Sequence, residues 1–221
     1  MTFKLDHFLC YSIEPQGTFR ARSVVVSDQF GKTKVVAVKP ESLCTPASKN
    51  EGPVLDERAH LLCYSLKVPR TFRAPVTIAN QLDKAKFTAY RLASLCLPTG
   101  KSLSFEVTPP VPKKLGHYSC YLIKAAAPPE RDVSVTDQFL RDPQKFALTR
   151  RLRVCNPAVK VRAGVTSPIL NRRDHLVCYS LEGDAQFEQQ RVLVRNQFGK
   201  MALTVVTPRT LCIPSLKRKL S

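Results

Sequence analysis

Four near-copies of a His-x-x-Cys-Tyr motif hold the residues of this 221-residue sequence that are best suited to chemistry. They read HFLCYSI at 7–13, HLLCYSL at 60–66, HYSCYLI at 117–123 and HLVCYSL at 175–181. A histidine and a cysteine close in sequence can bind a metal, and cysteines can form redox centres or disulfides. Metal binding, redox chemistry and structural cross-linking are therefore the uses to compare.

A metal site on His7 and Cys10 and their equivalents conflicts with the geometry expected for this segment. The motif is short and apolar on both faces, which predicts a central β-strand. Residues three apart on a strand point to opposite faces, about 10 Å apart, whereas zinc needs its ligands within about 2.3 Å of one point. We therefore predict no metal and no cofactor, although histidines gathered at a pseudo-symmetric centre remain an alternative. No Cys-x-x-Cys pair supports a thioredoxin-like site.

The eight cysteines occur two to a copy, and their spacing favours a disulfide within each copy. The separations inside the copies are 34, 33, 35 and 34 residues, whereas those across the linkers are 19, 24 and 23. Each such disulfide, called a staple below, would contribute roughly 3–4 kcal/mol to the free energy of unfolding in the chain-entropy model. Free structural cysteines remain the alternative if the protein is cytosolic. The predicted pairs are Cys10–Cys44, Cys63–Cys96, Cys120–Cys155 and Cys178–Cys212.

Two further landmarks recur in the same order and make the whole chain a repeat. An Asp/Asn-Gln-Phe/Leu triplet occurs at 28–30, 80–82, 137–139 and 196–198, and a Cys-x-Pro-x-x-Lys segment begins at 44, 96, 155 and 212. These landmarks divide the chain into repeat 1 (1–55), repeat 2 (56–113), repeat 3 (114–171) and repeat 4 (172–221). The Pro-rich segment near 102–115 is a candidate boundary between two halves.

Within each repeat the apolar residues alternate, which predicts short antiparallel strands. The triplet lies between two alternating runs, and Gly31 and Gly199 follow it, which indicates a hairpin whose turn uses positive φ. The proline of Cys-x-Pro should end the strand ladder. The prediction is an all-β fold of four tandem antiparallel units of about 55 residues, in sandwich-like or barrel-like pairing. A four-bladed propeller-like ring is the alternative.

The first position of the triplet is not suited to acid–base chemistry. Asp28 and Asp137 hold it in two repeats, but Asn80 and Asn196 hold it in the others, and an amide does not replace a carboxylate in proton transfer. Both side chains can accept hydrogen bonds from the local backbone. We therefore expect a structural role, with the Phe or Leu of the triplet and the tyrosine of the first motif packed in the core.

The sequence carries 35 Lys and Arg against 17 Asp and Glu, a net charge of +18. The four repeats contribute +2, +5, +6 and +5, so the charge is not confined to a tail. Such an excess predicts attraction to a polyanion such as an acidic glycan, lipopolysaccharide or nucleic acid, and solubility alone is the competing explanation. The candidate contact residues are Arg150, Arg151, Arg153, Lys160, Arg162, Arg172, Arg173, Lys217, Arg218 and Lys219. Strand alternation would place Arg151 and Arg153 on one face.

Motifs of the common enzyme classes are missing. The sequence contains no Gly-x-Ser-x-Gly, Walker loop, dinucleotide-binding glycine turn or His-Glu-x-x-His. No run of about 18 apolar residues predicts a transmembrane helix. The segment before His7 has no room for a signal peptide.

The combined HFLCY, DQFG and LCxPxxK landmarks resemble a repeat of secreted bacterial proteins that is known as a domain of unknown function. The resemblance covers all four repeats and implies an exported, disulfide-containing β-repeat without a known activity or catalytic residue. Repeat 3 departs from it with SCYLI and RVCNP. We predict a non-catalytic extracellular or periplasmic module, for binding or structure, with a basic surface. A cytosolic nucleic-acid-binding protein is the second possibility, and an uncharacterised enzyme is the third.

Overall fold

The computed structural model describes residues 2–69, 72–125, 128, 131–140, 142–183 and 186–219, and its regular elements there are β-strands. They are β1 His7–Gln16, β2 Arg22–Asp28, β3 Gly31–Lys49, β4 His60–Lys67, β5 Ala74–Ala79, β6 Lys84–Ser102, β7 His117–Lys124, β8 Arg131–Thr136, β9 Gln144–Arg162, β10 Val165–Ser167, β11 His175–Glu182, β12 Gln190–Asn196 and β13 Gly199–Lys219. The all-β prediction is confirmed. In the described ranges no helix is long and apolar enough to cross a membrane.

Every repeat contributes the same three elements. The His-x-x-Cys-Tyr motif opens the first strand, and the second strand forms a hairpin with a long third strand of 19 to 21 residues. Gly31 and Gly199 have φ of 125° and 127° at two hairpin turns. Residues that carry a Cβ rarely adopt this backbone conformation. The strand, turn, strand pattern predicted from alternation is therefore present in each repeat.

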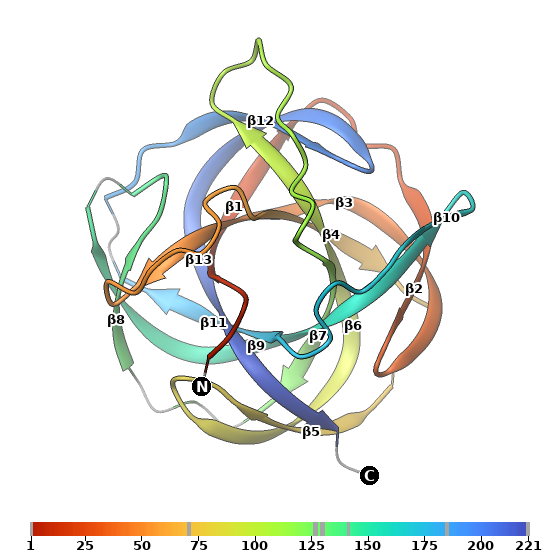
Figure 1. The fold of residues 1–221 in the computed structure, drawn as a ribbon, viewed down its shortest axis with the longest axis vertical. Coiled ribbons are helices and arrows are strands. Elements are labelled where there is room, and N and C mark those ends of the chain that lie inside the picture. Colours follow the sequence, from red (N-terminus) through yellow and green to blue (C-terminus); the bar gives the residue numbers. More distant parts are fainter. Residues whose placement is uncertain are drawn as a thin grey trace.

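Eight of the strands close into one antiparallel ring, viewed along its axis in Figure 1. Its order is β1, β3, β4, β6, β7, β9, β11 and β13, and β13 pairs with β1 to complete it. The four repeats thus share one sheet, in contrast to a propeller, whose blades are separate sheets. Because β1 and β13 are the first and last strands, ring closure depends on the two ends of the chain.

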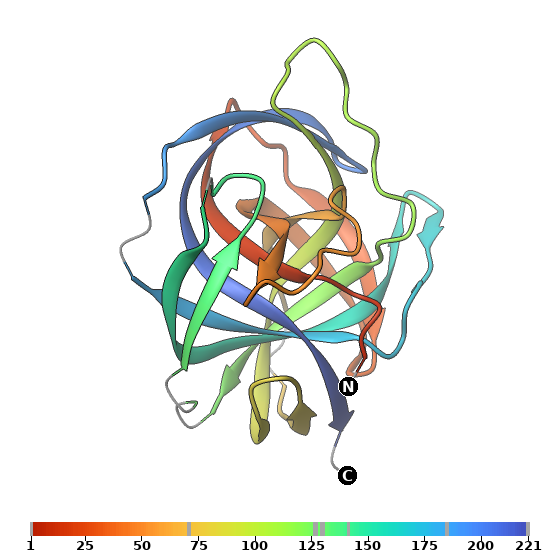
Figure 2. The same cartoon turned by 60° about the vertical axis from the view of Figure 1, so that its left-hand side comes forward.

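The hairpins lie against the outside of the ring (Figure 2). The end of each long strand pairs with the hairpin of the repeat two positions along: β3 with β8, β6 with β12, β9 with β2 and β13 with β5. An extensive outer core fills the space between ring and hairpins, and its members include Leu9, Tyr11, Val24 and Val26. Each repeat therefore contacts the other three.

The proline of Cys-x-Pro does not end the strand, and that prediction is wrong. β3 continues through Pro46 to Lys49. Pro46 faces Phe8 of β1, whereas pairing with β4 stops at Cys44. At this point the long strand has a neighbour on one side only, so the missing N–H of proline interrupts no ladder. The strand leaves one ring neighbour there and then joins a hairpin of another repeat.

Candidate functional site

The inward side chains of the ring form three layers. Register places Phe8 opposite Pro46, Cys10 opposite Cys44 and Ser12 opposite Ser42, and the other repeats follow the same order. The outer layers therefore consist of apolar residues at one end and mainly hydroxyl residues at the other. The middle layer consists of the eight cysteines, which are between 2% and 6% exposed.

All eight cysteines form disulfides within their own repeats, with the pairing predicted from their spacing. The disulfides also contact one another. Cys10 Sγ lies 3.7 Å from Cys212 Sγ, and Cys96 Sγ lies 3.7 Å from Cys120 Sγ. Because these sulfurs are oxidised, the distances are van der Waals contacts between neighbouring staples. Four disulfides are typical of proteins that fold in an oxidising environment.

A cavity of about 210 Å³ lies within the ring, and all eight cysteines line it. Phe8, Leu61 and Leu176 line it at one end, and each is almost completely buried. Ser12, Ser42 and Thr210 line it on the hydroxyl side. We call this space the sulfur-lined cavity. It was not predicted, because closure of the ring depends on strand pairs between repeats.

A β-bulge in each long strand shapes the hydroxyl end of the cavity. Each long strand has two register shifts against one ring neighbour, and the shift nearer the cysteine places an extra residue at Glu41, Ala93, Leu152 and Arg209. A bulge breaks strict alternation and turns side chains to a new direction. Glu41, Leu152 and Arg209 consequently line the sulfur-lined cavity. Neither Glu41 nor Arg209 was among the predicted site residues, since alternation alone gave no signal for the bulge.

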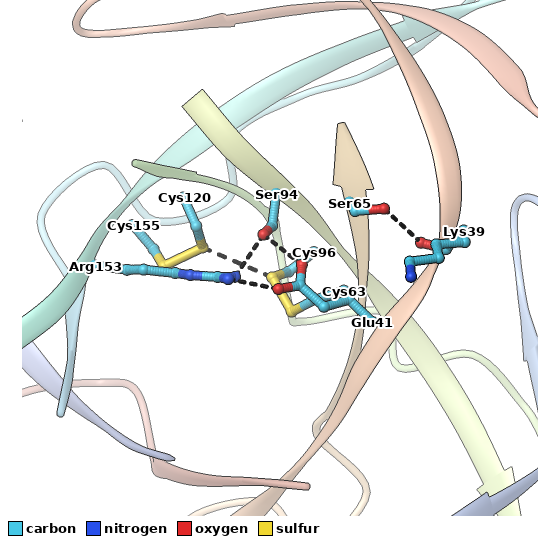
Figure 3. Close-up of polar contacts among 9 residues, drawn as sticks. All are labelled: Lys39, Glu41, Cys63, Ser65, Ser94, Cys96, Cys120, Arg153 and Cys155. Atoms are coloured by element: carbon cyan, nitrogen blue, oxygen red, sulfur yellow. Dashed lines mark hydrogen bonds and ion pairs between the residues drawn. A yellow bond between two sulfur atoms is a disulfide. The ribbon is translucent and has the colours of Figure 1, made fainter. Parts of the chain in front are cut away.

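Arg153 reaches across this end of the ring to Glu41 (Figure 3). Its guanidinium pairs with the carboxylate and also donates to Ser94 Oγ at 2.5 Å, and Ser94 Oγ donates to Glu41 at 2.8 Å. Burial by itself would raise the pKa of Glu41, but its hydrogen bond to Arg153 and the attraction of that charge lower the pKa. The pair thus holds a charged carboxylate over the disulfides of repeats 2 and 3.

The prediction that Arg151 and Arg153 share a face is wrong, because the bulge at Leu152 separates them. Arg151 pairs with Asp83, and both side chains are largely buried. Arg153 points into the ring instead. Neither guanidinium is positioned as part of an exposed row that follows a phosphate backbone.

On the outward face, each tyrosine of the first motif meets the triplet of the repeat two positions along. Tyr11 donates to Asp137 at 2.9 Å and Tyr121 donates to Asp28 at 2.8 Å. In the other two repeats the amides of Asn196 and Asn80 donate to Tyr64 and Tyr179, each at 2.9 Å. The two amide bonds are buried and the two carboxylate bonds are part-buried, and all four cross-link opposite repeats.

The triplet also has the local structural role that its Asp/Asn exchange indicated. A side-chain oxygen at its first position accepts the N–H two residues later, at 2.7 to 2.9 Å, in all four repeats. The aromatic third residue packs on the tyrosine, for example Phe139 on Tyr11 with ring centroids 5.2 Å apart. This explains why both an acid and an amide serve at one position.

We predict that Asp137→Ala destabilises the protein far more than Asp137→Asn. Asp137 accepts bonds from Tyr11, from Thr45 and from the N–H groups of Phe139 and Leu140. Alanine leaves these buried donors unpaired, which costs about 3 kcal/mol, whereas asparagine keeps an oxygen for the backbone. Urea unfolding of both variants measures the difference, and equal losses would contradict the proposed hydrogen-bonding role.

The histidine of the first motif lies on the outward face, opposite to its neighbouring cysteine, as strand geometry predicted. His7 Nε2 lies 3.2 Å from Gln81 Oε1 and His60 Nε2 lies 3.2 Å from Gln138 Oε1. Burial, together with the charge of a neighbouring lysine, lowers the pKa of each of the four histidines to about 4. His7 and His60 therefore bind the next repeat as neutral rings, whereas Nδ1 of His175 bonds to the carbonyl of Arg173 in its own repeat.

Four of the predicted polyanion contacts meet in one surface hollow of about 650 Å³. Arg172, Arg173, Lys217 and Arg218 line it. Lys84, which sequence reasoning missed, lines it as well, and none of the described residues in its wall is acidic. We call it the basic groove. Pairing of β13 with β5 brings the end of repeat 4 to the β5–β6 hairpin of repeat 2. No local pattern in the sequence predicts this contact.

The remaining candidates are dispersed. Arg150 is exposed on β9 and Lys219 is exposed at the end of β13. Lys160 is buried, and burial together with the charge of Arg162 lowers its pKa to about 8. Arg162 donates to the carbonyl of Gln197 at 3.2 Å and lies over the ring of Phe198. Lys160 and Arg162 therefore stabilise the contact between repeats 3 and 4.

Residues 73–214 match a family described as a repeat of unknown function (DUF7450). The match covers well over half of the chain, so the chain belongs to this family. Comparison with curated proteins and with solved structures returned no match.

Proposed function

We propose that this DUF7450 protein is an exported, non-catalytic module that binds polyanions through the basic groove. The disulfides support export to an oxidising compartment, extracellular or periplasmic, because cytosolic thiols are normally kept reduced. The structural use of the Asp/Asn triplet supports a non-catalytic role, since its two carboxylates are occupied by hydrogen bonds within the fold.

The single observation that carries the proposal is the one-sided charge of the groove. Five Lys and Arg side chains line a hollow of about 650 Å³ without a described acidic neighbour in its wall. Arg172, Arg173, Arg218 and Lys84 are exposed, so their charges are available to a ligand. A concave surface of one sign concentrates its field and attracts the opposite charge.

The fifth cation, Lys217, contributes less. Burial lowers its pKa to about 8, against the attraction of Asp28, and its Nζ lies 4.1 Å from the ring centroid of Phe30. The ammonium is thus directed toward Phe30, although Lys217 is one of the residues that line the groove. We assign polyanion contact to the four exposed cations and a supporting role to Lys217.

We expect the replacement of four groove residues by glutamine to lower the affinity for polyanions and to make that affinity less dependent on salt. The four residues are Lys84, Arg172, Arg173 and Arg218. Each lost phosphate or sulfate contact removes a released counterion, so the slope of log affinity against log salt should fall by up to about 4 for duplex DNA. The matched control replaces Lys67, Arg91, Lys124 and Arg131, which are exposed but lie outside the groove wall. It changes the net charge by the same amount.

Heparin, duplex DNA and single-stranded RNA should be compared between roughly 50 and 200 mM salt. Similar binding to all three, reduced by the groove variant only, supports a general polyanion site. Strong preference for one nucleic acid would favour a nucleic-acid-binding protein. Equal weakening by both variants would show that net charge alone acts, and failure of the native protein to bind any of the three would refute the proposal.

A further inference from the structure

The sulfur-lined cavity lies at the centre of the ring and is separate from the basic groove in its lining residues. Its wall combines two chemically different parts. Disulfide sulfurs and the side chains of Phe8, Leu61 and Leu176 make one part, and the residues at the bulges make the other. We propose that this cavity binds a small molecule with a short apolar body and one carboxylate. This inference does not depend on the polyanion proposal.

The size and surface of the cavity match a small apolar body. An apolar protein cavity of about 150 Å³ is large enough to bind benzene, and this one measures about 210 Å³. It is smaller than the sites of drug-sized ligands, which are typically about 300 Å³ or more. Sulfur is polarisable and contacts apolar groups favourably. A chain of a few carbons would therefore gain contacts at the disulfides.

The charges at the bulge end favour a carboxylate over a neutral head group. Arg153, Arg209 and Glu41 are the charged residues in the wall. Glu41 is committed to Arg153 and Ser94, so its charge is already balanced. Arg209 forms no ion pair with any residue in the described ranges and is exposed. One uncompensated positive charge thus remains at this end of the cavity.

Comparison of the four repeats shows that Arg209 is not required by the fold. The other bulges carry Glu41, Ala93 and Leu152, so a short or apolar residue is tolerated at this position. The hydroxyl groups of Ser42 and Thr210 lie in the same wall and can donate further hydrogen bonds to a carboxylate. The Ser12 hydroxyl donates to the carbonyl of Thr207 instead. A guanidinium with nearby hydroxyl donors is a suitable receptor for one carboxylate.

The experiment compares hexanoate with hexanol on the oxidised full chain, in which Leu methyl groups carry ¹³C. Hexanoate should shift the methyl signals of Leu61 and Leu176, which lie in the cavity, but not that of Leu203, which lies in the outer core. Hexanol should bind the same site roughly tenfold more weakly, because a charge-assisted hydrogen bond contributes on the order of 1.4 kcal/mol or more.

Arg209→Gln should reduce hexanoate affinity to that of hexanol and leave hexanol unchanged, whereas Arg20→Gln, an exposed residue outside the cavity wall, should change neither. The variant with four glutamines in the basic groove should retain hexanoate binding, which separates the two proposals. Equal affinities for hexanoate and hexanol, shifts that avoid Leu61 and Leu176, or no binding of hexanoate would each overturn the inference.

Discussion

Reduction of all four disulfides is expected to unfold the protein. Each staple closes a loop of 33 to 35 residues, and four such loops together contribute roughly 15 kcal/mol in the chain-entropy model. The loops do not overlap in sequence, so their contributions should nearly add. This sum reaches the upper end of the total stability of a typical domain, about 5–15 kcal/mol.

The buried position of the sulfurs determines how this test is carried out. Because the cysteines are at most 6% exposed, a phosphine reductant should react slowly with the folded protein. The protein should therefore be reduced in urea and the urea then removed while reductant is kept. Near-UV circular dichroism reports on the six tyrosines, and the same cycle without reductant is the control. A reduced protein that regains the native spectrum and the same unfolding midpoint would contradict the prediction.

A single staple should be dispensable. The double variant Cys63→Ala and Cys96→Ala is expected to fold, with a free energy of unfolding lower by roughly 3–4 kcal/mol. Three remaining staples and the ring hydrogen bonds would still close the sheet. A contrast between the loss of one disulfide and the loss of four would indicate that the disulfides compensate for limited apolar burial within each repeat, since a unit of this size is marginal by itself.

Local features of this fold were predictable from sequence, and long-range ones were not. The pairing of Cys10 with Cys44 follows from a spacing that recurs in every repeat, and the hydrogen bond that the N–H of Phe30 donates to Asp28 spans two residues. By contrast, Lys84 reaches the basic groove only because β13 pairs with β5, more than a hundred residues away. Local patterns contain no information about that pairing.

The bulges account for the main errors at the candidate site. Arg151 and Arg153 would share a face in a regular strand, but one extra residue at Leu152 directs them to opposite sides of the sheet. The equivalent bulge in β13 has Arg209 as its extra residue, and Arg209 lines the cavity. A bulge breaks the alternation of faces, and a second shift follows within a few residues in each long strand. A strand prediction without the bulges therefore misplaces the functional groups between and beside them.

Acidification from pH 7 to pH 4 is expected to remove much of the stability of the protein. Burial and nearby lysines lower the pKa of the four motif histidines from 6.5 to about 4. In this window the unfolded chain binds protons that the folded chain does not, so stability is present above pH 6.5 and is lost as the pH falls toward 4. Each histidine accounts for up to roughly 3 kcal/mol, as one pKa unit corresponds to about 1.36 kcal/mol.

Three aspartates act in the opposite direction and limit this loss. Burial raises the pKa of Asp6, Asp28 and Asp137, so the folded state binds their protons more readily and is favoured as they become protonated. This effect sets in as the pH falls toward the raised pKa of each aspartate in the folded state and is complete below about 3.9, where a carboxylate of the unfolded chain titrates. The contribution of the histidines is therefore obtained as the difference between variants that share the same three aspartates.

Urea unfolding at several pH values between 7.5 and 4.5 measures that slope, and NMR titration of the histidine ring protons identifies the groups responsible. His60→Gln, which removes one of the four titrating rings without introducing a charge, should reduce the histidine contribution to the slope by about a quarter. The matched control is Gln16→His, an exposed position on β1, which adds a histidine with an ordinary pKa and should leave the slope unchanged. Ring protons that titrate near pH 6.5, or an unfolding midpoint constant down to pH 4.5, would show that burial does not hold the histidines neutral.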